Sequence, residues 1–244
     1  MATVIELERI SKSFAIPSER RATVRDHIFG LFRPRRFERL QVLDQISVKV
    51  EKGETLGIMG RNGCGKSTLL KILCGIYQPE TGRVVVSAPL TPILELGIGW
   101  NQELDAVDNI LLIGTAMGLT LDEAKAAVDP VLEFSGLERF KSLSVKHYSS
   151  GMAARLSYAV AFHAVQEVLI LDEVLAVGDA GFKEKCEKRF ERLIAKGRTG
   201  VLVSHSPAMI AQFCSRAILL DGGRIACEGK PDEVIAAYNK VNGL

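Results

Sequence analysis

Apolar and polar residues alternate along two stretches near the start of the chain, residues 3–8 and 42–50. Such period-two patterns predict half-buried β-strands. Residues 17–41, between the two stretches, instead show a helical apolar pattern over 23–32, followed by the sequence Arg-Pro-Arg-Arg-Phe-Glu-Arg. We interpret residues 17–41 as an insertion that joins two neighbouring strands.

Apolar runs and amphipathic stretches alternate over most of the remaining chain. The runs predict strands over residues 55–59, 83–86, 92–96, 168–171, 201–204, 216–220 and 224–227, the last two joined by a hairpin turn at Asp221-Gly222-Gly223. The amphipathic stretches predict helices that begin near Lys66, Phe182, Pro207 and Pro231. Strands separated by helices predict an α/β fold with a mainly parallel sheet and helices on both of its faces.

The middle of the chain is mostly helical in pattern, with helices expected near residues 107–117, 121–134 and 149–164. We therefore expect a single domain over residues 1–244. In this division the core comprises residues 1–100 and 165–244, an inserted helical subdomain comprises about 101–164, and the basic insertion comprises about 17–41.

Composition excludes several classes of protein. The 244 residues are 47% hydrophobic and 25% charged, which excludes a disordered or collagen-like chain. The five cysteines are scattered and include no Cys-x-x-Cys pair, which favours a reducing compartment over a disulfide framework or a zinc site. The sequence shows no secretion signal and no stretch of about 20 uninterrupted apolar residues. We therefore expect a cytoplasmic protein, for which peripheral docking on a membrane stays open.

The charge of the chain is unevenly distributed. The net charge of +2 predicts neither nucleic acid nor a membrane surface as the dominant electrostatic partner. Residues 17–41, however, contain seven arginines against three acids, a local charge of +4, with Phe29, Phe32 and Phe37 between them. This composition suits either a surface that meets anionic headgroups or a lipid pyrophosphate, or a solvated helical insertion.

A glycine-rich sequence follows the strand expected at residues 55–59 and precedes a helix. It reads Gly60-Arg61-Asn62-Gly63-Cys64-Gly65-Lys66-Ser67-Thr68 and matches the pattern G-x-x-x-x-G-K-[ST]. Glycines let successive backbone N–H groups converge on phosphate oxygens, and the helix N-terminus adds positive dipole character. In this pattern Lys66 reaches the β- and γ-phosphates of a nucleotide, and the Ser67 hydroxyl binds Mg²⁺. The strand–loop–helix context argues against a chance match.

A second candidate lies at the end of the apolar run over residues 168–171, which Asp172 and Glu173 follow. A carboxylate at this point lies at the carboxyl edge of a parallel sheet, where ligands of open α/β folds bind. We expect Asp172 to hold Mg²⁺, directly or through water, and Glu173 to orient and deprotonate an attacking water. The alternative is that the two acids merely cap a turn. The presence of the glycine-rich loop in the same chain favours the functional interpretation over this one.

A third sequence indicates the family. Tyr148-Ser149-Ser150-Gly151-Met152 precedes a helix, about twenty residues before Asp172, and resembles the signature motif of ATP-binding cassette (ABC) ATPases, usually written LSGGQ. Ser149 and Gly151 are retained, whereas Tyr, Ser and Met replace the other three residues. The resemblance covers nearly the whole chain. It implies a P-loop NTPase fold with a RecA-like core, an antiparallel β subdomain and an inserted helical subdomain, and it implies ATP and Mg²⁺ as cofactors.

The resemblance also implies roles for further residues. His205 matches the histidine that contacts the γ-phosphate, Phe14 matches the aromatic residue that stacks on adenine, and Ala176-Val177-Gly178-Asp179 occupies the D-loop. The Q-loop glutamine of the family falls at Glu95, whose carboxylate is a further candidate ligand for Mg²⁺ or water. Gln102, the nearest actual glutamine, is the alternative at this position.

In this family two cassettes dimerise head to tail and bind ATP between the phosphate loop of one and the signature motif of the other. The resemblance therefore assigns catalysis to Lys66, Glu173 and His205 within one chain. It assigns contacts with the partner's nucleotide to the signature residues Ser149, Ser150, Gly151 and Met152. One chain alone would carry half of each of two sites.

The sequence departs from the common family pattern at several places, and in these it resembles the group of ATPases that export lipid-linked O-antigen, capsule or teichoic acid chains. These places are the signature sequence, the residues around Glu95, Val177-Gly178-Asp179 and the basic insertion. This implies a homodimer at the cytoplasmic face of the inner membrane, separately encoded integral membrane partners, a lipid-linked polysaccharide substrate near the insertion, and no nucleic acid. Some members carry a C-terminal carbohydrate-binding domain, so in a chain that ends at Leu244 this domain is absent or removed.

Other interpretations explain fewer of these features. An ABC ATPase that acts on nucleic acid or ribosomes usually carries two cassettes or coiled-coil arms, and neither fits within 244 residues. A switch GTPase would show an Asn-Lys-x-Asp motif, which is not found, and a P-loop kinase gives no reason for residues 148–152. A nucleotide sensor with little turnover conflicts with Glu173 and His205. An ABC ATPase for another transported substrate and a non-transport ABC ATPase stay open.

Overall fold

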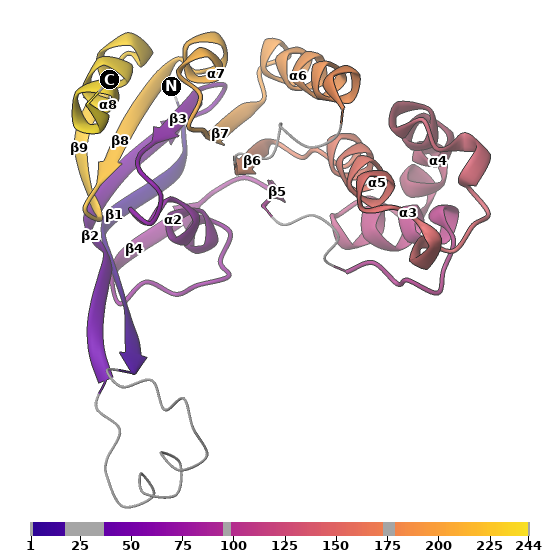
Figure 1. Ribbon diagram of the computed structural model, residues 1–244, viewed down its shortest axis with the longest axis horizontal. Coiled ribbons are helices and arrows are strands. Elements are labelled where there is room, and N and C mark those ends of the chain that lie inside the picture. Colours follow the sequence, from indigo (N-terminus) through magenta and orange to yellow (C-terminus); the bar gives the residue numbers. More distant parts are fainter. Residues whose placement is uncertain (1, 18–36, 95–98, 173–178, 244) are drawn as a thin grey trace, which may run out of the picture.

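The computed structural model describes residues 2–17, 37–94, 99–172 and 179–243, and these form two sheets with helices between and around them (Figure 1). The smaller sheet is antiparallel and has the strand order β2-β1-β4. Its members are β1 (Thr3–Pro17), β2 (Phe37–Glu51) and β4 (Thr81–Val86).

The larger sheet has six described strands and confirms the prediction of a mainly parallel sheet. Its order is β5 (Leu90–Ile93), β6 (Val168–Asp172), β7 (Thr199–Val203), β3 (Thr55–Met59), β8 (Arg216–Asp221) and β9 (Arg224–Gly229). The first five run parallel, and β9 pairs antiparallel with β8. The central strands β3, β6 and β7 are buried almost throughout, which explains why they read as continuous apolar runs.

Helices cover both faces of the larger sheet. Helix α2 (Lys66–Leu73) lies between the two sheets, and its buried side chains share one apolar core with them. On the opposite face a second apolar core joins the sheet to α6 (Ala180–Ala195), α7 (Pro207–Phe213) and α8 (Pro231–Asn242). The predicted helices in these regions are therefore confirmed: α2, α7 and α8 start at the expected residues, and α6 starts two residues before the expected Phe182.

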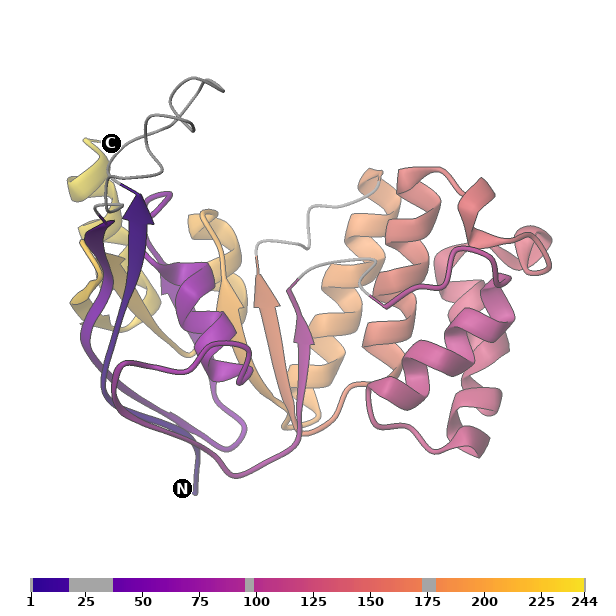
Figure 2. The same ribbon diagram turned by 90° about the horizontal axis from the view of Figure 1, so that it is seen from below.

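The helical middle of the chain forms a group of its own beside the β5 edge of the sheet (Figure 2). It contains α3 (Ala106–Ala116), α4 (Leu121–Ser135), α5 (Ser150–His163) and short 3₁₀ helices at Glu138–Phe140 and Val145–His147. A capping box starts α4: the Thr120 hydroxyl accepts from the Glu123 N–H at 3.2 Å, and the Glu123 carboxylate accepts from the Thr120 N–H at 2.8 Å. The helix ends at Gly136, whose φ of 69° is the left-handed conformation that favours glycine there.

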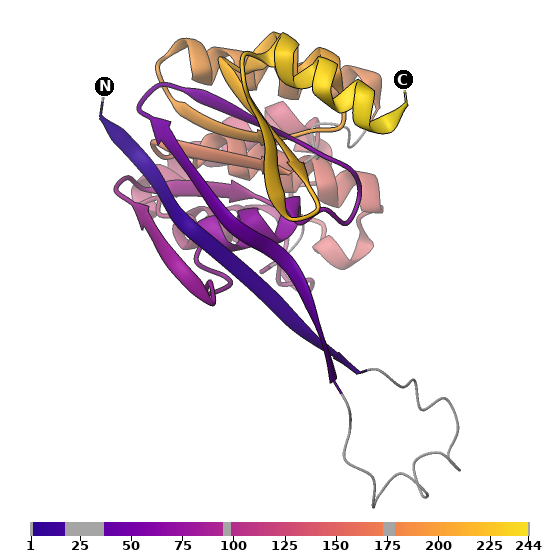
Figure 3. The same ribbon diagram turned by 90° about the vertical axis from the view of Figure 1, so that its left-hand side faces the viewer.

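Several strand boundaries differ from the sequence prediction, most of all those of β1, β2 and β5. Strands β1 and β2 stay paired as far as Pro17 and Phe37, and they form an arm that projects from the body (Figure 3). The first five residues of β2 are exposed, so no buried face imposes an alternating pattern on them. The strand expected at 92–96 is β5, which ends at Ile93 because its pairing with β6 runs only from Leu90 to that residue. The helical pattern at 23–32 lies outside the described residues.

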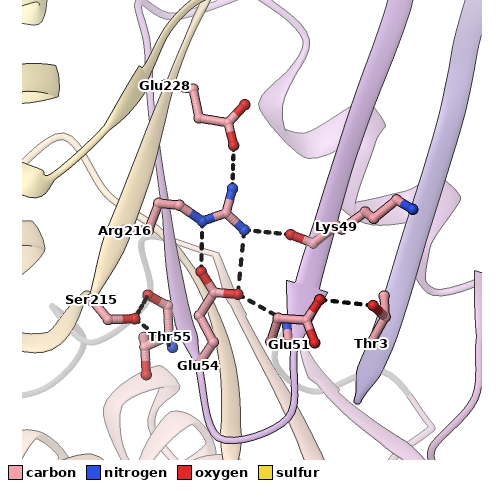
Figure 4. Close-up of polar contacts among 8 residues, drawn as sticks. All are labelled: Thr3, Lys49, Glu51, Glu54, Thr55, Ser215, Arg216 and Glu228. Carbon is pink, nitrogen blue, oxygen red and sulfur yellow. Dashed lines mark hydrogen bonds and ion pairs between the residues drawn. The ribbon is translucent and has the colours of Figure 1, made fainter. Parts of the chain in front are cut away.

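Arg216, at the start of β8, connects the two sheets (Figure 4). Its Nε donates to Oε1 of Glu54 at 2.7 Å, and its terminal nitrogens donate to Glu228 on β9 and to the Lys49 carbonyl on β2. The other carboxylate oxygen of Glu54 accepts from the Glu51 N–H at 2.8 Å. The guanidinium therefore ties β2, β8 and β9 to the turn that leads into β3.

We expect Arg216→Met to lower the free energy of unfolding by about 2 kcal/mol, because the half-buried Glu54 would lose its charged partner. Chemical denaturation measures this change. The matched control is Arg224→Met, whose guanidinium donates to Asp44 at 2.8 Å from a side chain that is 73% exposed. Its expected loss is under about 1 kcal/mol. Equal losses in the two variants would contradict the role given to Arg216.

Candidate functional site

The glycine-rich loop joins β3 to α2 at the carboxyl edge of the larger sheet. Gly65 is the N-cap residue of α2, with a φ of 108°. A Cβ atom here would lie 2.8 Å from the Val42 carbonyl oxygen, so both the backbone conformation and the close approach of β2 require glycine. The first turn of α2 has neither a side-chain cap nor an acidic residue. Its N–H groups are therefore available to a bound anion.

Lys66 opens α2, and its long side chain is buried. Its ammonium group donates hydrogen bonds to the carbonyl oxygens of Gly60, at 2.8 Å, and Arg61, at 3.1 Å. The side chain thus turns back over the loop that precedes the helix. The Lys66 ammonium group and the N-terminus of α2 therefore lie at the same point, and both favour a negatively charged ligand there.

Cys64 lies within the same loop and acts as a packing residue. A Cβ atom on Gly60 would lie 2.6 Å from the Cys64 sulfur, which shows how closely the loop is folded on itself. Burial raises the pKa of the Cys64 thiol, and the positive charge of Lys66 opposes this shift. The thiol is therefore neutral at physiological pH.

A cavity of about 410 Å³ lies over the loop and brings residues from three elements together. It is lined by Val42, Asn62, Gly63, Gly65, Lys66, Ser67, Thr68 and Asp172. Asp172 reaches it from the end of β6, where it pairs with Val203 of β7, and β7 lies next to β3. The sequence analysis missed Val42, because its position over the loop depends on how the smaller sheet packs.

His205 lies at the same edge of the sheet but does not line this cavity. It follows β7 by two residues and is half-buried. The buried Ser204 before it donates its N–H to the Ile58 carbonyl at 3.3 Å, which holds the start of this segment against β3. The Ser206 hydroxyl after it accepts from the Met209 N–H at 3.5 Å and starts α7. His205 is therefore fixed between two anchored residues.

Several candidate residues fall outside the part of the chain that the structure describes. They are Glu95, Glu173 and three residues of the expected D-loop, Ala176, Val177 and Gly178. Gln102, the alternative to Glu95, is exposed, and its carbonyl accepts a hydrogen bond from the Lys146 N–H at 3.0 Å. The segment around Gln102 is held by the buried Asn109, whose side-chain amide accepts from the Asn101 N–H at 2.9 Å and donates to three carbonyl groups of the same loop.

The signature sequence starts α5, away from the cavity. Ser149 is exposed and is the N-cap residue of α5, and its hydroxyl accepts from the Met152 N–H at 3.2 Å. The Tyr148 hydroxyl donates to the Phe140 carbonyl at 2.8 Å, which fixes the turn before the helix. Neither the signature serines nor Gly151 and Met152 line the cavity over the phosphate loop. The structure therefore does not bring the two motifs of one chain together.

Arg155 is a residue of this region that sequence reasoning missed. It forms an ion pair with Asp179, and its guanidinium lies 5.7 Å from the centroid of the Phe182 ring. Asp179 also caps α6 by accepting from the Phe182 N–H at 2.9 Å, and this hydrogen bond is the main reason that the pKa of Asp179 is lowered. Arg155 therefore ties the signature helix α5 to the end of the expected D-loop, across 24 residues of sequence.

Phe14, the candidate adenine-stacking residue, lies on β1 and is half-buried. Its ring packs edge-on against Tyr77 with centroids 5.6 Å apart. The Lys12 ammonium lies 5.5 Å from the Phe14 ring and donates to the Gln78 carbonyl at 2.9 Å. Phe14 does not line the cavity over the phosphate loop.

Two further properties bear on what the chain can bind. Among the described residues, no group of three or more His, Cys, Asp or Glu side chains is arranged to hold a metal ion. No helix in the described part of the chain has the length and apolar character that a membrane span requires.

Residues 43–176 match a family model described as ABC transporter. The chain is 40% identical over 205 residues to the O-antigen export system ATP-binding protein RfbB of Myxococcus xanthus, covering 84% of this chain and 47% of that protein. It is 33% identical over 243 residues to the protein of the same name from Klebsiella pneumoniae, covering 98% and 99%. The chain spans 65%, 47% and 36% of the length of three of its relatives.

Solved structures show the same fold. An ATP-binding subunit of an ABC transporter superposes with a TM-score of 0.75 at 23% identity, covering 99% of this chain and 94% of that one. A dimeric ATP-binding cassette in a post-hydrolysis state, bound to ADP and Pi, gives a TM-score of 0.73 at 21% identity, covering 93% and 98%. At these identities the likeness concerns the fold alone.

Proposed function

Since the chain belongs to the ABC transporter family, we propose that it is the ATP-hydrolysing subunit of a transporter that exports a lipid-linked polysaccharide. The observation that supports ATP binding is the cavity in which Lys66, Ser67 and Asp172 meet over a helix N-terminus. Relatives named as O-antigen and teichoic acid export ATP-binding proteins support the class of substrate.

The cavity also offers the donor set that Mg²⁺ prefers. The Ser67 hydroxyl and the Asp172 carboxylate both belong to its lining, and Mg²⁺ in nucleotide sites typically takes one or two carboxylates together with phosphate oxygens and water. These two side chains therefore fit a magnesium ion that arrives with ATP, and Glu95 is the third proposed ligand. When bound, the ion neutralises charge on the phosphate oxygens.

The remaining catalytic roles follow from position. We assign to Lys66 the contact with the β- and γ-phosphates, because its side chain lines the cavity and its ammonium group lies against the first residues of the loop. Glu173 directly follows Asp172, and we assign it the orientation and deprotonation of the attacking water. His205, at the same sheet edge, is assigned the γ-phosphate contact, and Phe14 is assigned the stacking contact with adenine.

A head-to-tail homodimer explains why the signature sequence and the cavity are separate within one chain. Ser149 and Ser150 are exposed, and they start a helix whose N-terminal N–H groups suit a phosphate. The dimeric cassette of the same fold supports this arrangement. In the proposed dimer, Ser149, Ser150, Gly151 and Met152 complete the nucleotide site of the partner. ATP then favours the closed dimer because it contacts both halves.

We propose that integral membrane partners bind the groove between the core and the helical subdomain, residues 101–164. This groove of about 580 Å³ has mostly apolar lining from β5, α3 and α5, and includes Trp100. Ile76 and Leu112, which also line it, are 58% and 43% exposed, as expected for side chains that a partner covers. With such partners, the proposed location of the chain is peripheral, on the cytoplasmic face of the inner membrane.

The basic insertion is proposed to lie near the lipid-linked substrate. In the sequence, residues 18–36 join β1 to β2, and the arm of these two strands presents the exposed side chains of Ile16, Phe37 and Leu40. Arg39 on this arm is already paired, because it donates to Glu80 at 2.6 Å and to the Ser13 hydroxyl at 2.8 Å. The arginines outside the described residues are therefore the stronger candidates for meeting a pyrophosphate or anionic headgroups.

Lys66→Ala is expected to weaken ATP binding by about ten- to a hundredfold, because a charge-assisted hydrogen bond to phosphate is lost. Isothermal titration calorimetry measures the affinity. Lys196→Ala, which removes an exposed lysine at the end of α6, is the control and is expected to bind as the parent does. Unchanged affinity in Lys66→Ala would refute the assignment.

Glu173→Gln is expected to keep ATP affinity and to lower turnover by roughly 100-fold or more, because the general base is removed while the nucleotide contacts remain. A phosphate-release assay gives the rate, and size-exclusion chromatography with ATP detects the trapped dimer. Glu191→Gln, an exposed acid on α6, serves as the matched control. Hydrolysis near the parent rate in Glu173→Gln would show that another group activates the water.

Replacing Arg33, Arg35 and Arg36 with Ala is expected to impair polysaccharide export while sparing the ATPase activity of the isolated subunit, because none of these arginines belongs to the motifs to which we assign nucleotide binding. Export is measured as surface polysaccharide in cells that carry the variant. Arg39→Ala is the matched control, since that guanidinium is already paired with Glu80. Normal export by the triple variant would rule out a role of these charges at the substrate.

A further inference from the structure

A second polar pocket lies where α4, α5 and α6 meet, and none of its residues lines the cavity over the phosphate loop. The three helices are neighbours (Figures 1 and 2), and the Phe134 ring of α4 packs against Phe162 and Phe182, with centroids 6.2 and 5.7 Å apart. The pocket has a volume of about 370 Å³ and is lined by Pro130, Glu133, Phe134, His163, Lys185, Lys188, Arg189 and Arg192. This size lies in the lower part of the range of small-molecule sites, roughly 300–1,000 Å³.

One face of α6 gives the pocket its charge. Lys185, Lys188, Arg189 and Arg192 follow one another at steps of three, one and three residues, which places all four on the same side of the helix. Lys188 is paired with Glu184 at 2.6 Å. Within the described part of the chain Lys185 and Arg192 form no ion pair, and Glu133 is the one acid among the described lining residues. The pocket therefore carries an excess of positive charge.

Arg189 is less exposed than the other three basic residues. One terminal nitrogen donates to the Phe162 carbonyl at 3.3 Å, whereas its Nε is buried and has no hydrogen-bond partner among the described residues. Burial, and then the positive charge of Arg192, lower the pKa of Arg189. The Arg189 guanidinium therefore keeps a buried donor, Nε, that an anion in the pocket could satisfy.

His163 forms the opposite wall, at the end of α5. Its Nδ1 lies 2.7 Å from the Ala159 carbonyl oxygen, which only accepts, so Nδ1 carries the hydrogen. Burial is the main reason that the pKa of His163 is lowered; the hydrogen bond to the Ala159 carbonyl opposes this shift, and the charge of Arg189 adds to it. An anion bound beside it would favour the charged ring and raise that pKa.

We propose that this pocket binds the phosphate group of a small soluble molecule at a site separate from the nucleotide site. Arg189, Arg192 and Lys185 supply the cationic donors that phosphate prefers. Phe134 and Pro130 offer an apolar edge for the remainder of the molecule, and Glu133 is an acceptor for its hydroxyl groups. Because α4 belongs to the helical group and α6 packs on the larger sheet, a bound phosphate ties these two parts together.

The test uses NMR of the histidine ring resonances in the full chain, at constant ionic strength. Inorganic phosphate and glucose 1-phosphate are the two probes, and His163→Gln assigns the signal. We expect a saturable shift of the His163 resonance and a rise of its pKa by about half a unit or more at saturation. Tighter binding of glucose 1-phosphate identifies a phosphorylated molecule as the ligand, and equal binding identifies free phosphate. Because the signal is local, phosphate bound at the loop of residues 60–68 does not imitate it.

The variant Lys185→Gln with Arg192→Gln, both exposed at the pocket, is expected to weaken binding by about tenfold. Lys183→Gln, which removes a charge from α6 outside the pocket, is the matched control and is expected to bind as the parent does. Neither variant is expected to change ATP affinity. Absence of a His163 response, equal affinity in the double variant, or a response to anionic vesicles alone would overturn the proposal.

Discussion

The parallel pairing of β6, β7 and β3 is the constraint on which the proposed nucleotide site depends. Parallel strands end at the same edge of a sheet, so the loop after β3, the Asp172 carboxylate at the end of β6 and His205 after β7 share that edge, although more than 130 residues separate the loop from His205. The register determines how far along the strand direction each group lies: Asp172 lies opposite Val203, and each residue is the last of its strand. Burial of all three strands keeps this register from slipping.

The smaller sheet closes the site from one side. Strand β2 approaches the phosphate loop so closely that Gly65 has no room for a side chain beside the Val42 carbonyl. The turn between β8 and β9 approaches the same strand, since the Gly223 carbonyl accepts from the Asp44 N–H at 2.8 Å. Arg216 holds the far end of β2 through Lys49. The position of β2 over the loop therefore depends on contacts at three points along it.

The sequence predicted the elements of the larger sheet well because those elements are buried, and burial leaves a periodic pattern. It failed at the arm of β1 and β2, where Phe37 and Leu40 are exposed and no buried face imposes an alternating pattern. The loop of residues 60–68 and Asp172 could be singled out because each is a local pattern at the end of a strand, and the structure places both at one cavity. Val42 and Arg155 were missed because each acts through a contact between distant segments, which no local pattern encodes.

Helix α5 links three features that the sequence presents separately. Its first residues carry the signature sequence. Arg155, about one turn later, forms the ion pair with Asp179 at the start of α6. His163, at the end of α5, lines the polar pocket where α4, α5 and α6 meet. Helix α6 packs on the larger sheet. A displacement of α5 relative to this sheet would therefore strain the Arg155–Asp179 ion pair and, at the same time, change the shape of the pocket between α4, α5 and α6. A ligand that favours one arrangement of α5 and α6 therefore also favours one position of the signature residues, by an amount equal to its difference in affinity for the two arrangements.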